Sequence, residues 1–126
     1  MPRFGRQSLI RLGEVHPELM ALAHAVVAKV DCTVLCGYRG EKEQQEAYKL
    51  GHSRAQFGES PHNRKPSMAI DLVPWPIDWS NIPRFEAFAQ TVKETAKELN
   101  IEIVCGADFK AFKDYPHFEL KDWRKR

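Results

Sequence analysis

The segment of residues 60–74 limits the fold more than any other part of the chain; it reads S-P-H-N-R-K-P-S-M-A-I-D-L-V-P. Residues 68–73 alternate with the two-residue period of a β-strand, which puts Asp71 on the face opposite to Ile70 and Leu72. A carboxylate in the middle of such a strand is costly to bury unless a partner offsets its charge. A metal ion would be such a partner, and the same segment holds His62 on a polar loop.

Three residues form the candidate metal site. Zinc binds His nitrogen and Asp oxygen readily, and a catalytic zinc site needs three protein ligands and one open position. His117, in D-Y-P-H-F-E-L, is the best third candidate. If residues 68–73 and 117–120 are antiparallel neighbours, Asp71 and His117 lie on one face and His62 reaches in from its loop. Spacing alone is equally compatible with three scattered surface groups.

A hydrolytic metal site also needs a general base close to the attacking water. Asp114 precedes His117 by three residues, across a turn that contains Pro116. Glu119 follows His117 by two residues and lies on the same face of the predicted strand. The spacing leaves both carboxylates open as the base.

Length and composition describe one soluble domain. At 126 residues, with 43% hydrophobic and 29% charged residues, the chain is expected to form one domain around a single core. The net charge of +2 is small and no dense basic stripe is present, so we expect no nucleic-acid partner. The chain ends W-R-K-R, which is either a solvated end or a segment attracted to an acidic polymer such as a bacterial cell wall.

The cysteines and the first residues indicate the compartment of synthesis. Cys32, Cys36 and Cys105 are odd in number and form no C-x-x-C pair, which predicts buried free thiols rather than disulfides. The opening M-P-R-F-G-R-Q-S lacks the apolar core of a signal peptide, and no apolar run is long enough to span a membrane. We therefore expect synthesis in a cytoplasm and no stable membrane association.

Hydrophobic periodicity predicts an α+β domain. The predicted helices cover residues 17–30, 41–50 and 81–99, and the predicted strands cover residues 32–36, 68–73, 101–105 and 117–120. Residues 52–65 are a polar loop, and residues 107–115 are irregular. Prolines on both sides of Trp75 exclude a regular helix there, and Trp75 and Trp79 either line a groove or pack over the core. This order of elements predicts a small antiparallel sheet with helices packed on one side.

The paired motifs resemble those of the zinc D-Ala-D-Ala carboxypeptidase and VanY-type peptidase family, which has the hedgehog/DD-peptidase fold. The family pattern is S-x-H-x(n)-A-x-D, followed by an acid three residues before a last His. The matching residues are Ser60, His62, Ala69, Asp71, Asp114 and His117, and G-Y-R at residues 37–39 matches a further family segment. The opening S-L-I-R-L-G-E-V-H-P-E-L is similar to phage endolysins with L-alanyl-D-glutamate peptidase activity.

The match covers nearly the whole chain, with one departure. The interval from His62 to Asp71 is nine residues, two more than is commonest in the family. The additional residues lie in N-R-K-P-S, where a loop can absorb them. The resemblance therefore still implies the family's ligand geometry, with a changed rim of the substrate cleft.

The resemblance assigns a role to each matched residue. It implies that His62, Asp71 and His117 bind Zn²⁺, and that Asp114 is the general base that later protonates the leaving amine. Glu119 then supports the site, because the family places its catalytic acid before the last histidine. Arg39 is implied to hold a substrate carbonyl or the developing oxyanion. Ser60 is implied to bind substrate or to support the site.

The resemblance further implies a single zinc peptidase domain over residues 1–126 that cuts a peptidoglycan stem peptide. The expected enzyme is a monomeric phage endolysin of the L-alanyl-D-glutamate type, made in the host cytoplasm and reaching the wall through a holin-type lesion. One alternative is a D-Ala-D-Ala carboxypeptidase. A second is a non-catalytic zinc-stabilised domain that binds cell walls, although a structural site has no need of Asp114. A metal nuclease is a third alternative, weakened by the small net charge.

Overall fold

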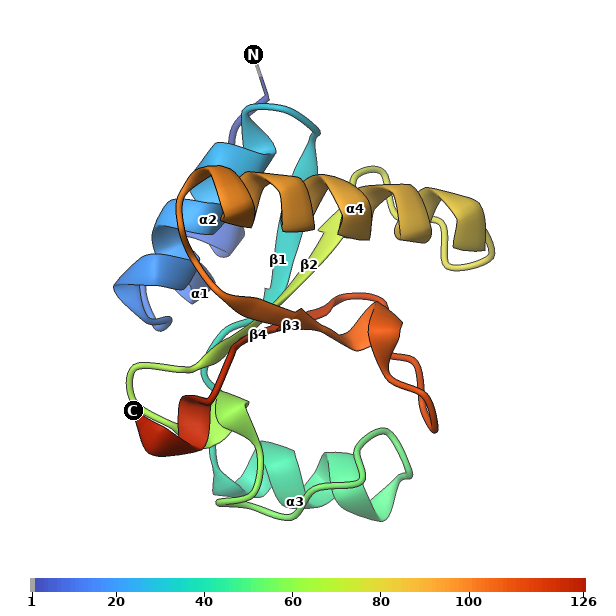
Figure 1. Ribbon diagram of the computed structural model, residues 1–126. Coiled ribbons are helices and arrows are strands. Elements are labelled where there is room, and N and C mark those ends of the chain that lie inside the picture. Colours follow the sequence, from blue (N-terminus) through green and yellow to red (C-terminus); the bar gives the residue numbers. More distant parts are fainter. Residues whose placement is uncertain (1) are drawn as a thin grey trace.

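Four antiparallel strands form one sheet in the order β1-β2-β4-β3 (Figure 1). The computed structural model describes residues 2–126. The strands are β1 (Cys32–Cys36), β2 (Ala69–Pro74), β3 (Ile103–Cys105) and β4 (His117–Leu120). The predicted strands are confirmed, with β2 shifted by one residue and β3 two residues shorter at its start.

The register of the sheet brings the two predicted strand ligands together. β2 lies between β1 and β4, and Asp71 is directly opposite His117 in the β2–β4 pair. Opposite residues of an antiparallel pair share one face of the sheet, so both side chains lie on the same side. In the β1–β2 pair Asp71 is opposite Cys36, and the pairing is irregular between Val34 and Cys36. The predicted antiparallel neighbours are therefore confirmed.

The apolar face of the sheet packs against two helices. The α-helices are α1 (Arg6–Leu12), α2 (Pro17–Val27), α3 (Glu41–Lys49) and α4 (Ile82–Glu98). α2 and α4 pack against each other and on the sheet, while α3 lies across the molecule from them (Figure 1). Phe88 of α4 contacts Phe118 of β4 edge-on, with ring centroids 6.2 Å apart. Full burial of such a side chain contributes roughly 1.5–3 kcal/mol.

Local sequence explains the helix ends. Helix α2 begins at Pro17, and the His16 ring caps it by accepting a hydrogen bond from Glu18 N at 3.1 Å. Asn81 caps α4. α2 ends three residues before the predicted end of its helix. Periodicity does not predict α1, because seven residues form only about two turns and Gly5 offers no side-chain cap. None of the helices within residues 2–126 combines the length and apolar character needed to cross a bilayer.

Three single-turn 3₁₀-helices complete the chain: η1 (Pro61–Asn63), η2 (Gly106–Asp108) and η3 (Trp123–Lys125). All three cysteines are free thiols. Cys32 and Cys105 are buried as predicted, and burial raises their pKa to about 12 and about 11. The prediction was wrong for Cys36, which is half-buried because it lies at the end of β1 beside the candidate site.

Candidate metal centre

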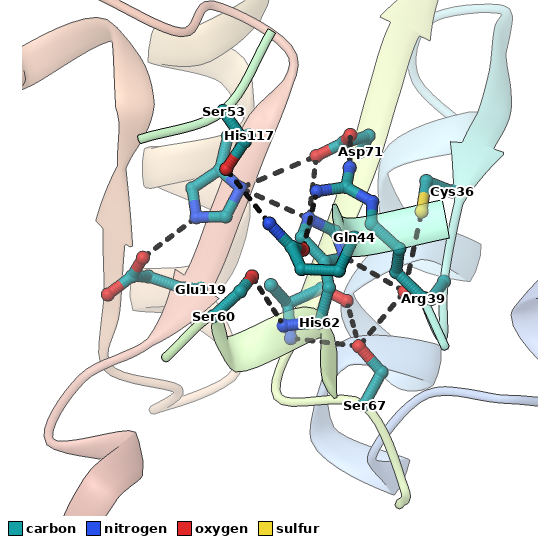
Figure 2. A network of polar contacts seen from close by, with 12 residues as sticks. Cys36, Arg39, Gln44, Ser53, Ser60, His62, Ser67, Asp71, His117 and Glu119 are labelled. Atoms are coloured by element: carbon teal, nitrogen blue, oxygen red, sulfur yellow. Dashed lines mark hydrogen bonds and ion pairs between the residues drawn. The ribbon is translucent and has the colours of Figure 1, made fainter. Parts of the chain in front are cut away.

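His62, Asp71 and His117 meet at one point on the open face of the sheet (Figure 2). The Nε2 atom of His62 lies 3.1 Å from Asp71 Oδ1 and 3.2 Å from His117 Nδ1. His117 Nδ1 lies 3.4 Å from the same Asp71 oxygen. The structure therefore brings together the three residues that the sequence singled out, although they are spread over more than 50 positions of the chain.

Local hydrogen bonds place His62 beside the sheet. Pro61 begins η1, and Ser60 Oγ caps it by accepting from His62 N at 3.2 Å. In turn, the Asn63 side chain accepts a hydrogen bond from Ser60 N at 3.2 Å, and the two hydrogen bonds form a capping box. P-H-N is thus a short helical turn, capped by Ser60, whose second residue, His62, is the candidate ligand. Ser60 is buried in this turn, and its hydroxyl is already engaged with the backbone.

In each imidazole one nitrogen points away from the cluster, and this outer nitrogen has its own hydrogen-bond partner. His62 Nδ1 contacts the carbonyl oxygen of Gly37 at 2.8 Å, and because a carbonyl can only accept, Nδ1 carries the hydrogen in this contact. His117 Nε2 contacts Glu119 Oε1 at 2.7 Å, where the carboxylate is likewise the acceptor. The inner atoms, Nε2 of His62 and Nδ1 of His117, then face Asp71, where a bound metal would take the place of their protons.

The electrostatics of the cluster keep Asp71 ionised. Burial raises the pKa of Asp71, but the charges of His62 and His117 and their hydrogen bonds act more strongly and hold that pKa well below its usual range. Burial lowers the pKa of His62, but the charge of Asp71 and its hydrogen bond outweigh burial and raise this pKa to about 10. The half-buried carboxylate of Asp71 is thus balanced by positive partners, the role that a metal ion can take over.

The donor set fits a divalent metal. One ligand atom from each of the three residues lies within 4.8 Å of the others, and two imidazole nitrogens with one carboxylate oxygen are a set that zinc accepts. Each imidazole is fixed through its outer nitrogen, as metal-binding histidines commonly are. The cluster therefore fits a metal with one position left open.

Arg39 lies beside the cluster and is held by a buried side chain. Its Nη2 atom is 3.7 Å from Asp71 Oδ2, and its Nη1 atom donates to Gln44 Oε1 at 3.1 Å. Gln44 has no exposed surface, and its Nε2 donates to the carbonyl of Ala55 at 2.7 Å and to Ser53 Oγ at 3.0 Å. Gln44 thereby ties α3 and the following loop to the site. The sequence did not predict this role of Gln44, because a Gln in a polar helix is ordinarily exposed.

Asp114 lies on the segment between η2 and β4. Its backbone N–H donates to Gly106 O at 3.0 Å, and its carbonyl accepts from His117 N at 3.0 Å. A Cβ at Gly106 would overlap the Asp114 carbonyl and come within 2.9 Å of His117 Cβ, so only glycine permits this close approach. Burial, followed by the negative charge of Asp71, raises the pKa of the Asp114 carboxyl. Such a shift suits a group that must both accept and return a proton.

Glu119 has a different environment from Asp114. Its carboxylate contacts the outer nitrogen of His117, and the two nitrogens of an imidazole point away from each other. Glu119 therefore lies on the side of the ring opposite to the meeting point of the three ligand atoms. This position fits support of His117, as the sequence analysis expected for Glu119, better than contact with a reacting water.

A cavity of about 640 Å³ opens over the cluster. Every residue that the sequence analysis placed in the site, apart from Asp71, lines it; these are Arg39, Ser60, His62, Asp114, His117 and Glu119. Asp71 lines a neighbouring cavity of about 750 Å³ together with Asp114. The candidate metal centre is thus accessible from two adjoining hollows.

Two imidazoles and one carboxylate at an open sheet face, with a further carboxyl and a guanidinium beside them, fit a metallopeptidase. The profile of the phage L-alanyl-D-glutamate peptidase family matches residues 1–122. The chain belongs to this family.

Individual relatives agree with the profile. The chain is 32% identical to the peptidoglycan L-alanyl-D-glutamate endopeptidase CwlK of Bacillus subtilis over 127 aligned residues, covering 85% of this chain and 74% of that protein. It is 32% identical to the L-alanyl-D-glutamate peptidase of Escherichia phage T5, covering 94% and 89%. The crystal structure of the Serratia marcescens L-Ala D-Glu endopeptidase ChiX superposes with a TM-score of 0.82 at 27% identity, covering 98% of this chain and 93% of that one.

Proposed function

We propose that this protein is a zinc peptidase that hydrolyses the L-Ala–D-Glu bond of peptidoglycan stem peptides. The observation that carries the proposal is the convergence of His62, Asp71 and His117 at an open cleft, in a chain that belongs to the L-alanyl-D-glutamate peptidase family. The alternative of a D-Ala-D-Ala carboxypeptidase is less well supported, because the matching relatives carry the names of L-alanyl-D-glutamate peptidases.

The three ligands would hold the metal through His62 Nε2, His117 Nδ1 and a carboxylate oxygen of Asp71. Zinc bound there supplies a Lewis acid that polarises a carbonyl and lowers the pKa of water. Glu119 and the Gly37 carbonyl keep the two imidazoles in the required orientation.

Asp114 and Arg39 would act on the substrate. Asp114 accepts a proton from the attacking water and gives it to the leaving amine of D-glutamate, and its raised pKa makes it a stronger base for the first of these transfers. Arg39 donates hydrogen bonds to the oxygen on which negative charge develops. Its hydrogen bond to Gln44 fixes the guanidinium before substrate arrives. Ser60 would contribute through the turn that carries His62 and through the cleft wall.

The proposed setting is lysis of a bacterial host. All three ligands, Asp114 and Arg39 come from one chain, so a monomer is sufficient for the chemistry. The relative in phage T5 supports a phage endolysin made in the host cytoplasm, which would reach the wall through a holin-type lesion.

The products of digestion test the proposal directly. Purified muropeptides are incubated with the zinc-loaded protein, and the fragments are identified by mass spectrometry. Cleavage of L-Ala–D-Glu leaves a sugar that carries lactyl-L-Ala and a peptide with D-Glu at its N-terminus. Chelation should abolish this cleavage, and added zinc should restore it. Release of the terminal D-Ala alone would instead identify a carboxypeptidase, and no cleavage would favour a binding domain.

A further inference from the structure

The candidate metal centre separates two cavities of different character. Asp114, His52 and Phe112 line both of them. The wall of the first, which we call the basic cleft, contains the cations Arg39, Arg54, Lys110 and Arg124. The wall of the second, which we call the aromatic groove, contains Trp79, Ile82, Phe85, Tyr115 and Pro116 together with Asp71. The first wall also carries the rings of Phe109 and Trp123, and the second also carries Lys113, whose Nζ donates to the carbonyl of Ala107 at 2.9 Å. A substrate that crosses the centre therefore meets most of the cations on one side and the stacked rings of Trp79 and Phe85 on the other.

The aromatic groove is a prearranged platform. Trp79 stacks on Phe85 with ring centroids 5.5 Å apart and an interplanar angle of 17°, and Phe85 contacts Tyr115 at 6.1 Å. Phe85 is only 2% exposed, so it anchors the stack in the core, while Trp79 is 57% exposed. One face of the indole is supported and the side chain remains largely open to solvent. The segment that carries Trp79 joins β2 to α4 (Figure 1).

The basic cleft is suited to anions. Arg54 lies over the ring of Phe112 at 5.2 Å and Arg124 over the ring of Trp123 at 4.4 Å, contacts that hold both cations at the cleft wall. Glu119, in the same wall, is already the acceptor for His117 Nε2.

The substrate of the proposed reaction has the same asymmetry. On the amino side of the L-Ala–D-Glu bond, L-Ala is linked through a lactyl group to the N-acetylmuramic acid ring, which presents apolar C–H groups. On the carboxyl side of a muramyl tripeptide, D-Glu and the terminal residue carry free carboxylates. One residue and a lactyl group span at most about 7 Å, so the sugar must bind next to the metal centre.

We propose that Trp79 and the aromatic groove bind the N-acetylmuramic acid ring, and that the carboxylates of the stem peptide lie in the basic cleft. This inference rests on the proposed function and fixes the direction of the substrate across the metal centre. The indole face buries the apolar C–H face of the sugar, a gain in dispersion and in hydrophobic burial. The opposite direction would place the anionic carboxylates against the stacked rings of Trp79 and Phe85 and away from Arg54, Lys110 and Arg124.

Two substrates and two tryptophan variants test the proposal. The substrates are a muramyl tripeptide and the same tripeptide with an N-acetyl group in place of the sugar. Wild-type protein should have the higher kcat/KM on the muramyl substrate. Trp79→Ala should lower the ratio of the two kcat/KM values by roughly ten- to hundredfold, an effect of the size that follows removal of an aromatic side chain stacked on a nucleobase. Trp79→Phe should keep most of the ratio.

Trp75 provides the matched control. It is 51% exposed and belongs to the same segment, but it does not line the aromatic groove. Trp75→Ala should leave the ratio at the wild-type value. An unchanged ratio in Trp79→Ala, with wild type cleaving both substrates, overturns the sugar site and leaves the proposed function standing. If wild type cleaves neither substrate, the proposed function fails and the sugar site falls with it.

Discussion

At the scale of the residue, two carboxylates flank His117 and the structure separates their environments. Glu119 contacts the outer nitrogen of the ring at 2.7 Å, whereas Asp114 lines both hollows beside the metal centre and has a raised pKa. The sequence alone left either residue as the base. Orientation of the imidazole, which spacing does not reveal, favours Asp114.

We therefore expect different kinetics from the two isosteric variants. Asp114→Asn cannot accept a proton, so its turnover should fall by about 10²–10⁴ while its zinc content stays at the wild-type level. Glu119→Gln should retain far more turnover at full zinc occupancy, and its main defect should be about 10- to 100-fold weaker zinc binding. Both variants are assayed on the same muropeptide. A dead Glu119→Gln beside an active Asp114→Asn would reverse the assignment of the base.

The sequence predicted the metal cluster through the resemblance of its paired motifs to a zinc peptidase family, because spacing alone was equally compatible with three scattered surface groups. Strand alternation predicted that Asp71 and His117 lie in strands, whereas the capped turn that carries His62 was expected only as part of a polar loop. Gln44 could not be predicted, because its burial depends on Ser53 and Ala55 folding back over α3. That contact is a tertiary one, and hydrophobic periodicity in the sequence does not predict it.

At the scale of the element, the segment from η2 to β4 depends on Gly106. The backbone of Asp114 passes so close to Gly106 that no side chain fits between them. This approach, together with the hydrogen bond from Asp114 N to Gly106 O at 3.0 Å, fixes the loop that carries the candidate base. The sequence predicts where β3 ends, but it does not predict that the following loop packs against Gly106, because this contact joins residues that are apart in the chain.

Gly106→Ala should displace this loop and impair both stability and activity. Overpacking of this kind costs about 1–3 kcal/mol, so the free energy of unfolding should fall by that amount and turnover should fall with it. Gly5→Ala is the matched control, because its Cβ would meet nothing within 4 Å. Chemical denaturation and turnover are measured on both variants. If Gly106→Ala keeps the stability and the turnover of the wild type, the close approach at Gly106 does not fix the loop that carries Asp114.

At the scale of the whole molecule, the sheet divides the domain into a core side and a site side. Its apolar face packs on α2 and α4, while the opposite face carries Asp71 and His117 towards α3 and the cleft (Figures 1 and 2). The overall α+β class followed from the sequence because each strand and each long helix has its own period. The short helix α1 and the 3₁₀ turns did not, because they are too short to show one.

The zinc content of the protein tests the central claim most directly. Elemental analysis of dialysed wild type should find one zinc per chain, because His62, Asp71 and His117 supply one set of ligands. His62→Ala should lose the zinc and the peptidase activity together. His24→Ala, which removes an exposed histidine of α2, should keep both. A full equivalent of tightly held zinc in His62→Ala would contradict the account, because the metal would then lie elsewhere.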